Sequence, residues 1–275
     1  MDLFMEMISY PFIQRAIVVG VLVSLCAALL GVSLVLKRYA MIGDGLSHVG
    51  FGALAFATVL NLAPLSVAMP VVIAAAFFLL RISENSKIKG DSIIALISTG
   101  ALALGVMAVS VSKGVNVDIH NYMFGSILAI QSRDVVLTII LSIMVILLYL
   151  FFYDQIFLVT FDENFAKATG VKVEFYNMLI ALLTAVTIVL GMRLVGALLI
   201  SSLIVFPSVI SMKLFKSFKS VVISASIVSV ISFLSGIFIS YVYSTPTGAS
   251  VVVINIIIFT IFAFFKRLTT CFKRV

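Results

Sequence analysis

The sequence predicts an all-α protein, a polytopic bundle of transmembrane helices, and three observations carry this prediction. Hydrophobic residues make up 63% of the 275 residues, charged residues make up only 11%, and the mean hydropathy is +1.30. A soluble domain carries about 25% charged residues and could not hide so much apolar surface from water. The apolar runs are continuous and about twenty residues long, whereas membrane strands would alternate apolar and polar residues over about ten.

Apolar stretches long enough to cross a membrane follow one another along almost the whole chain. The expected spans are 12–36, 42–60, 64–80, 92–112, 134–153, 175–192, 194–211, 220–243 and 249–265. Nine spans are favoured and eight are the alternative, because only "GMRLVG" separates the sixth stretch from the seventh. No loop is long enough to fold alone, so residues 1–275 form a single transmembrane domain.

The basic residues predict how the chain is oriented. With the N-terminus outside, the loops on the opposite side hold 14 of the 18 Lys and Arg residues. These are Lys37, Arg38, Arg81, Lys87, Lys89, Lys167, Lys172, Lys213, Lys216, Lys219, Lys266, Arg267, Lys273 and Arg274. Cytoplasmic loops carry such an excess, so this side and the C-terminus are expected in the cytoplasm. The net charge of +7 therefore reflects topology in lipid rather than nucleic-acid binding.

Two connections between spans differ from simple turns. In the outer connection, 112–134, the half-apolar stretch "YMFGSILAI" is too short to cross, which predicts a re-entrant or interfacial helix. In the longest cytoplasmic loop, 154–176, Asp162 and Glu163 open a short helix-competent run that Gly170 closes. A short capped helix there could dock another protein; the alternative is a solvated loop with one chance turn.

The segment "MIGDGLSHVG" places Asp44 and His48 inside an expected span. A charge near the middle of a membrane helix costs roughly 2.5–3.5 kcal/mol on insertion scales, so the two residues need a reason to be there. Residues four apart share one helix face. A carboxylate with an imidazole suits zinc, manganese or ferrous iron, and is poor for potassium or sugars. The flanking glycines, 43, 45, 50 and 52, allow close helix approach or an unwound turn beside a pathway.

The alternative for this pair is a hydrogen-bonded Asp–His contact that pins two helices together. Two ligands are also too few for a tight zinc site, which needs four. A two-fold dimer would bring two copies of each residue to a central axis. On the outer side, Asn116, Asp118 and His120 form "NVDIH", which is either a waystation for an ion or, as the simpler interpretation, a polar stretch of loop.

Missing motifs exclude several activities. The sequence contains no GxxxxGK[ST], so the chain does not bind ATP through a P-loop. It has no HExxH, and an Asp–His pair without an activated serine makes no hydrolase. We therefore do not expect the chain to be an enzyme.

Five segments together resemble the membrane permease subunits of bacterial ABC importers for zinc, manganese and iron. They are "RYAMIGDGLSHVGFGALAFA", "VDIHNYMFGSILAI", "FDENFAKATGVKV", "VGALLISSLIVFPSVIS" and "TPTGASVVV". The resemblance implies a homodimer in a bacterial or archaeal cell membrane. It implies that Asp44 and His48 hold the transported ion, and that no cofactor is permanently bound.

The resemblance also implies partners. A separate cytoplasmic ATPase would bind a coupling helix that includes Asp162, Glu163, Ala166 and Gly170, and an extracytoplasmic solute-binding protein would deliver the metal. The sequence does not choose among zinc, manganese and iron. The alternative function is a stand-alone secondary transporter or channel, in which Asp44 and His48 form a proton relay and no docking loop is needed.

Overall fold

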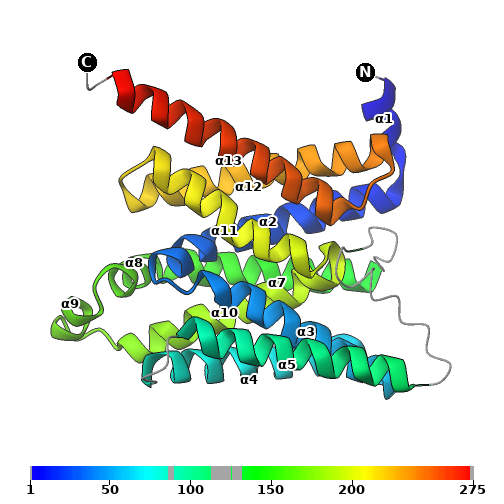
Figure 1. Ribbon diagram of the computed structural model, residues 1–275, viewed down its shortest axis with the longest axis horizontal. Coiled ribbons are helices and arrows are strands. Elements are labelled where there is room, and N and C mark those ends of the chain that lie inside the picture. Colours follow the sequence, from blue (N-terminus) through cyan, green and yellow to red (C-terminus); the bar gives the residue numbers. More distant parts are fainter. Residues whose placement is uncertain (1, 86–89, 113–124, 126–131, 273–275) are drawn as a thin grey trace.

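The computed structural model describes residues 2–85, 90–112, 125 and 132–272, and every regular element in these ranges is a helix. Nine of these helices are long and apolar enough to cross a membrane (Figure 1). They are α2 (Pro11–Leu36), α3 (Ala40–Val59), α4 (Pro64–Asn85), α5 (Gly90–Val111), α7 (Ser132–Phe151), α10 (Val173–Val195), α11 (Ala197–Leu214), α12 (Phe218–Tyr243) and α13 (Thr247–Phe272). Shorter helices are α1 (Asp2–Ser9), α8 (Tyr153–Phe161) and α9 (Glu163–Ala168). This confirms the predicted fold class and the favoured count of spans.

The close spacing of the sixth and seventh spans is explained by one glycine. Gly196 alone separates α10 from α11, and its φ of 94° lies in the left-handed region that other residues rarely adopt. The chain turns back there, so α10 and α11 meet near Gly196 and diverge away from it (Figure 1). A reversal within one residue explains why the apolar signal hardly drops between the two spans.

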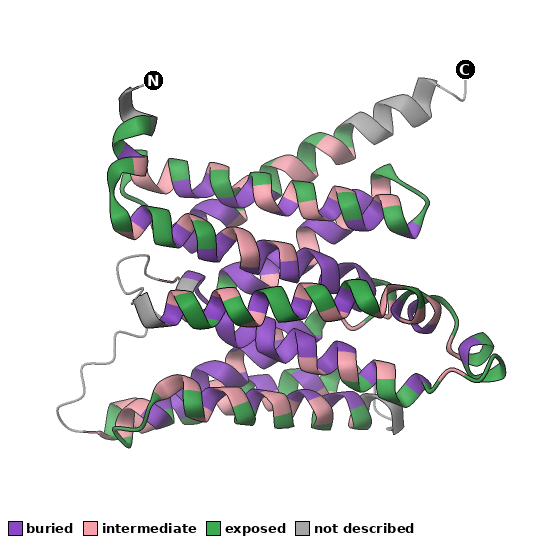
Figure 2. Cartoon of the chain, turned by 180° about the vertical axis from the view of Figure 1, so that it is seen from behind, coloured by how far each residue is buried: buried purple, intermediate pink, exposed green. Residues whose placement is uncertain are grey.

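The buried residues gather where α2, α3, α10 and α11 meet (Figure 2). Helix α2 packs against α10, α11, α12 and α7, and α3 packs against α5, α4, α11 and α10. The apolar residues that remain exposed lie on outward faces, as expected for helices that contact lipid. This arrangement places α3, with its two polar side chains, against the inner helices rather than at the edge of the bundle.

Helices α3 and α5 approach each other closely because both carry glycine at the contact. A Cβ atom at Gly52 would lie 2.7 Å from the carbonyl oxygen of Ala101, and one at Gly105 would lie 2.9 Å from the Cα of Gly52. Small residues allow this spacing between membrane helices. The expectation of close approach is confirmed. The alternative of an unwound turn is wrong, because α3 is continuous from Ala40 to Val59.

The loop between α8 and α10 contains the short capped helix that the sequence predicts. The Asp162 carboxylate accepts hydrogen bonds from the backbone N–H groups of Asn164 and Phe165, both at 3.0 Å. Gly170 has a φ of 85° just after the helix ends. The alternative of a solvated loop is therefore wrong. The expected outer helix near 122–130 and the pair Asp118 and His120 lie outside the described residues, apart from Gly125.

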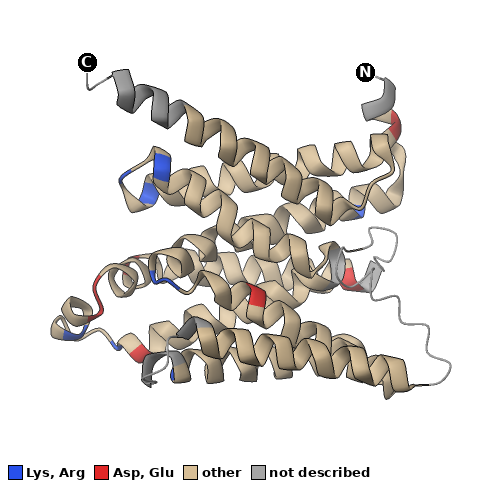
Figure 3. Cartoon of the chain, viewed as in Figure 1, with Lys and Arg blue, Asp and Glu red and all other residues tan. Residues whose placement is uncertain are grey.

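Charge is distributed unevenly along the direction of the spans. Most described Lys and Arg residues lie at the end that carries α9 and the turn between α11 and α12 (Figure 3). The C-terminus lies toward that end, and the N-terminus lies at the other (Figure 1). This is the asymmetry on which the predicted orientation depends.

Candidate functional site

Asp44 and His48 occupy the second and third turns of α3. With a rise of 1.5 Å per residue, they lie about 6 and 12 Å along a helix about 30 Å long. The helix packs against α11 on one side and α5 on another. Both polar residues are therefore held within the depth of a membrane span.

The two side chains point toward a common space. His48 Nε2 lies 3.6 Å from Asp44 Oδ2, which is longer than a hydrogen bond. The His48 side chain is 23% exposed and that of Asp44 is 47% exposed. These two atoms do not bond each other directly and lie on one helix, so this contact alone does not join two helices. A half-exposed carboxylate at this depth needs a polar or protein neighbour rather than lipid.

Ser201 of α11 is the third polar group at the pair. Its hydroxyl lies 3.4 Å from Asp44 Oδ1 and 3.2 Å from the carbonyl oxygen of Ala197, and it can donate to either. The sequence suggests only a small packing residue at this position. Ser202 follows it directly, so the pattern alone does not indicate which hydroxyl faces α3.

The pair is incomplete as a metal site within one chain. Over the ranges that the structure describes, no three His, Cys, Asp or Glu side chains come together. Asp44 and His48 supply one carboxylate and one imidazole, and Ser201 adds only a neutral oxygen. A divalent metal ion is normally held by four or more ligands, so a metal ion at this pair would need further ligands from outside it.

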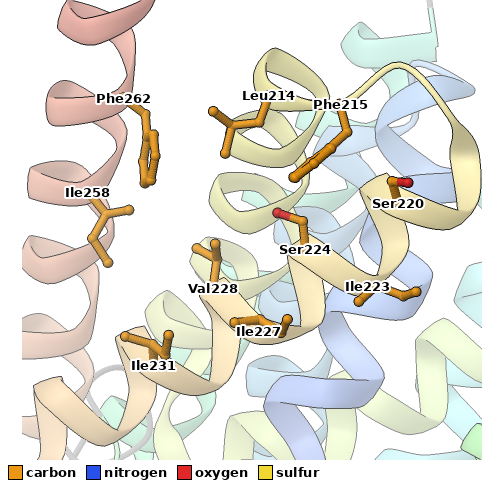
Figure 4. Close-up of a pocket in the computed structure, with 10 residues that line it drawn as sticks. All are labelled: Leu214, Phe215, Ser220, Ile223, Ser224, Ile227, Val228, Ile231, Ile258 and Phe262. Carbon is orange, nitrogen blue, oxygen red and sulfur yellow. The ribbon is translucent and has the colours of Figure 1, made fainter.

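A large groove elsewhere in the bundle has the wrong chemistry for an ion. It has a volume of about 660 Å³ and lies between the end of α11, α12 and α13 (Figure 4). Its walls are apolar apart from the hydroxyls of Ser220 and Ser224. Neither Asp44 nor His48 lines it, so the groove and the polar pair on α3 are separate features.

Comparison with known proteins assigns the chain to a family. The model of the ABC 3 transport family matches residues 9–266, which is nearly the whole chain. The chain belongs to this family.

Individual members of the ABC 3 transport family match the chain over most of its length. The manganese transport system membrane protein MntC of Halalkalibacterium halodurans is 29% identical over 96% of this chain and 90% of its own. The high-affinity zinc uptake system membrane protein ZnuB of Haemophilus influenzae is 31% identical over 94% of this chain and 98% of its own. These matches confirm the predicted resemblance to metal permeases.

The fold of this ABC 3 family chain also occurs in a solved structure. PsaBC from Streptococcus pneumoniae in complex with Fab superposes with a TM-score of 0.84. The sequence identity is 29%, and the match covers 95% of this chain and 94% of that one. The helical arrangement in Figure 1 is therefore shared with a chain of that solved structure.

The residues predicted for coupling lie in or beside α9 of this family member. Of the residues predicted for coupling, Asp162 caps the helix, Gly170 follows its end, and Ala166 is fully buried against Val159 and Val173. Ala166 is therefore part of the packing under the helix, whereas Asp162 and Gly170 lie at its two exposed ends. Phe165, which sequence reasoning missed, is 56% exposed there. Phe161, at the end of α8, is 59% exposed, so this loop presents two apolar rings, as contact surfaces often do.

Proposed function

We propose that this chain is the permease subunit of an ABC importer that carries divalent transition-metal ions into the cytoplasm, with Asp44 and His48 holding the ion in transit. The observation that carries the proposal is the carboxylate and imidazole on one face of α3, 3.6 Å apart and open to a neighbour. Relatives named for manganese and zinc transport support this class of cargo. The nine spans agree with a multi-pass protein of the cell membrane.

A second copy of the chain completes the site in this proposal. A two-fold axis beside α3 brings together two Asp44 carboxylates and two His48 imidazoles, which gives the four ligands that zinc prefers. It also covers the exposed side of Asp44 with protein. Because each copy contributes only two ligands, small relative movements of the copies weaken the site, which suits release of the ion.

The donor set admits more than one metal. One nitrogen and one oxygen per copy serve zinc, manganese and ferrous iron, and general affinity order favours zinc over manganese. Additional oxygen ligands favour manganese, and the Ser201 hydroxyls together with water supply such oxygens. Metal identity therefore depends on what reaches the site as well as on the pair itself.

The energy source and the delivery of metal belong to partner proteins. The sequence contains no P-loop, so a separate ATPase hydrolyses ATP and docks on α9, where Phe165 is exposed. The end that carries α9 also carries most of the described basic residues, which supports a cytoplasmic position for it. A solute-binding protein then delivers the metal from the opposite side.

The test is metal uptake by the chain reconstituted with its ATPase in vesicles. We expect His48→Ala to reduce ATP-driven uptake of Mn²⁺ and Zn²⁺ to background, while dimer formation and ATPase binding stay intact. The control is Thr58→Ala on the same helix, which removes only a hydroxyl bonded to its own helix. Normal uptake by His48→Ala would refute the metal role, and uptake without ATP would favour the stand-alone transporter.

A further inference from the structure

Lys37 lies at the corner between α2 and the helix that carries the metal-binding pair. It is the C-cap of α2, and only two residues separate it from the start of α3. Backbone hydrogen bonds close this corner, from Lys37 N–H to Ser33 O at 3.0 Å and from Tyr39 N–H to Leu34 O at 2.8 Å. Arg38 between them has a φ of 62°, as in a tight helix ending. A displacement of Lys37 therefore displaces the first turn of α3.

The Lys37 side chain joins this corner to three other helices. The Lys37 side chain is only 6% exposed. It donates to the carbonyl of Val159 at 3.1 Å, to Glu163 Oε1 at 2.6 Å and to Asn177 Oδ1 at 2.7 Å. These acceptors belong to α8, α9 and α10, and they use all three N–H protons of the ammonium.

Glu163, the carboxylate in this cluster, is the first residue of α9. Its Oε1 atom also accepts from Asn177 Nδ2 at 3.3 Å. Burial acts to raise the pKa of Glu163, but the hydrogen bond and charge of Lys37, helped by Asn177 and Lys167, outweigh burial and lower the pKa below its usual value. Glu163 is therefore ionised at neutral pH, and the contact with Lys37 is an ion pair.

We propose that Lys37 is a positioning residue that couples α9 to α3, so that movement of α9 by the bound ATPase changes how Asp44 and His48 hold the ion. The inference rests on the proposed function, in which α9 docks the ATPase. Separating the buried ammonium from Glu163 would leave a charge without its partner, which is far more costly than breaking an exposed pair. The corner before α3 therefore follows α9 instead of detaching from it.

The experiment measures ATP hydrolysis and Mn²⁺ uptake by the same reconstituted complex. Lys37→Met keeps most of the length of the side chain and removes its charge. We expect it to bind the ATPase and hydrolyse ATP, while the Mn²⁺ transported per ATP falls at least about tenfold. Lys216→Met is the matched control, because Lys216 is an exposed lysine in the turn between α11 and α12 at the same end of the bundle. An unchanged transport ratio in Lys37→Met would overturn the proposal.

A second variant keeps the proposal testable if Lys37→Met does not assemble. Glu163→Gln retains the shape of the side chain and removes its charge, and we expect a smaller loss in the same transport ratio. The double variant should transport no less Mn²⁺ per ATP than Lys37→Met alone, because both changes remove the same link between Lys37 and Glu163. The proposal would be contradicted if the loss of transport per ATP in the double variant equalled the product of the two single losses. A normal ratio in Glu163→Gln would contradict it as well.

A third variant distinguishes failure of this inference from failure of the proposed function. Phe165→Asp alters the exposed surface of α9 without touching the Lys37 cluster, and it should release the ATPase. If the ATPase stays bound and uptake is normal, α9 is not the docking element and the coupling route falls with it. If Phe165→Asp releases the ATPase but Lys37→Met transports normally, docking stands and only the role of Lys37 is lost.

Discussion

Glu163 and Asp44 are two carboxylates with contrasting surroundings. Glu163 is bonded to the Lys37 ammonium at 2.6 Å, so its charge is neutralised within the protein. Asp44 has no Lys or Arg partner among the described residues, and its closest polar neighbours are His48 and the Ser201 hydroxyl. The first carboxylate is therefore committed to structure, whereas the second remains available to a cation from outside the chain.

The ion pair at Glu163 predicts how stability depends on pH. A carboxyl group whose pKa is lowered by folding stabilises the protein fully above its unfolded pKa, here about 4.5, and loses that contribution as pH falls through the folded value. Thermal unfolding followed by circular dichroism should therefore show Glu163→Gln less stable than the unmodified chain at neutral pH. The difference between them should shrink below about pH 4.5.

The control for this measurement is Glu174→Gln, which removes an exposed carboxylate in the first turn of α10. The stability of Glu174→Gln should depend on pH in the same way as that of the unmodified chain. If the difference in stability between Glu163→Gln and the unmodified chain stays constant from neutral to acid pH, the charge of the Glu163 carboxylate contributes nothing to stability.

The helices were predictable from sequence because lipid imposes a simple rule. A span must satisfy its own backbone hydrogen bonds and expose apolar side chains, so each one appears as a long apolar run. The expected 42–60 and 220–243 correspond to α3 (Ala40–Val59) and α12 (Phe218–Tyr243). The ends differ by a few residues because capping depends on local contacts such as the corner at Lys37. Which helices touch was not predictable, because every span is apolar on most of its surface.

The close packing of α3 on α5 predicts different outcomes for two glycine substitutions. Gly52→Ala places a methyl group against the Ala101 carbonyl oxygen, so we expect a loss of about 1–3 kcal/mol in unfolding free energy. Gly100→Ala, on α5, meets nothing within 4 Å and should gain up to about 1 kcal/mol from helix propensity. Unfolding in detergent measures both. Equal effects of the two substitutions would show that α3 and α5 do not pack as closely as described.

At the scale of the whole molecule, the sequence singled out the polar pair on α3 but not its surroundings. Asp44 and His48 were visible because charge is rare in an apolar run, and their spacing places them on one face. Ser201 and the Lys37–Glu163 pair could not be predicted, because they join residues more than a hundred positions apart through packing. In the proposed dimer the other half of the site belongs to a second copy, which no pattern within one chain can locate.

The two-fold arrangement predicts which face of the chain meets its copy. Met41 is 49% exposed and lies one turn before Asp44 on nearly the same side of α3, so the two copies of Met41 should lie near each other across the axis. In a background without Cys26 and Cys271, Met41→Cys should form a covalent dimer in membranes, by oxidation or with a short bismaleimide. Ile140→Cys is the control, because it is 61% exposed on α7, which packs against α2 rather than α3. A dimer trapped through Ile140→Cys but not through Met41→Cys would place the axis away from Asp44, and each copy would then need another source for its missing ligands.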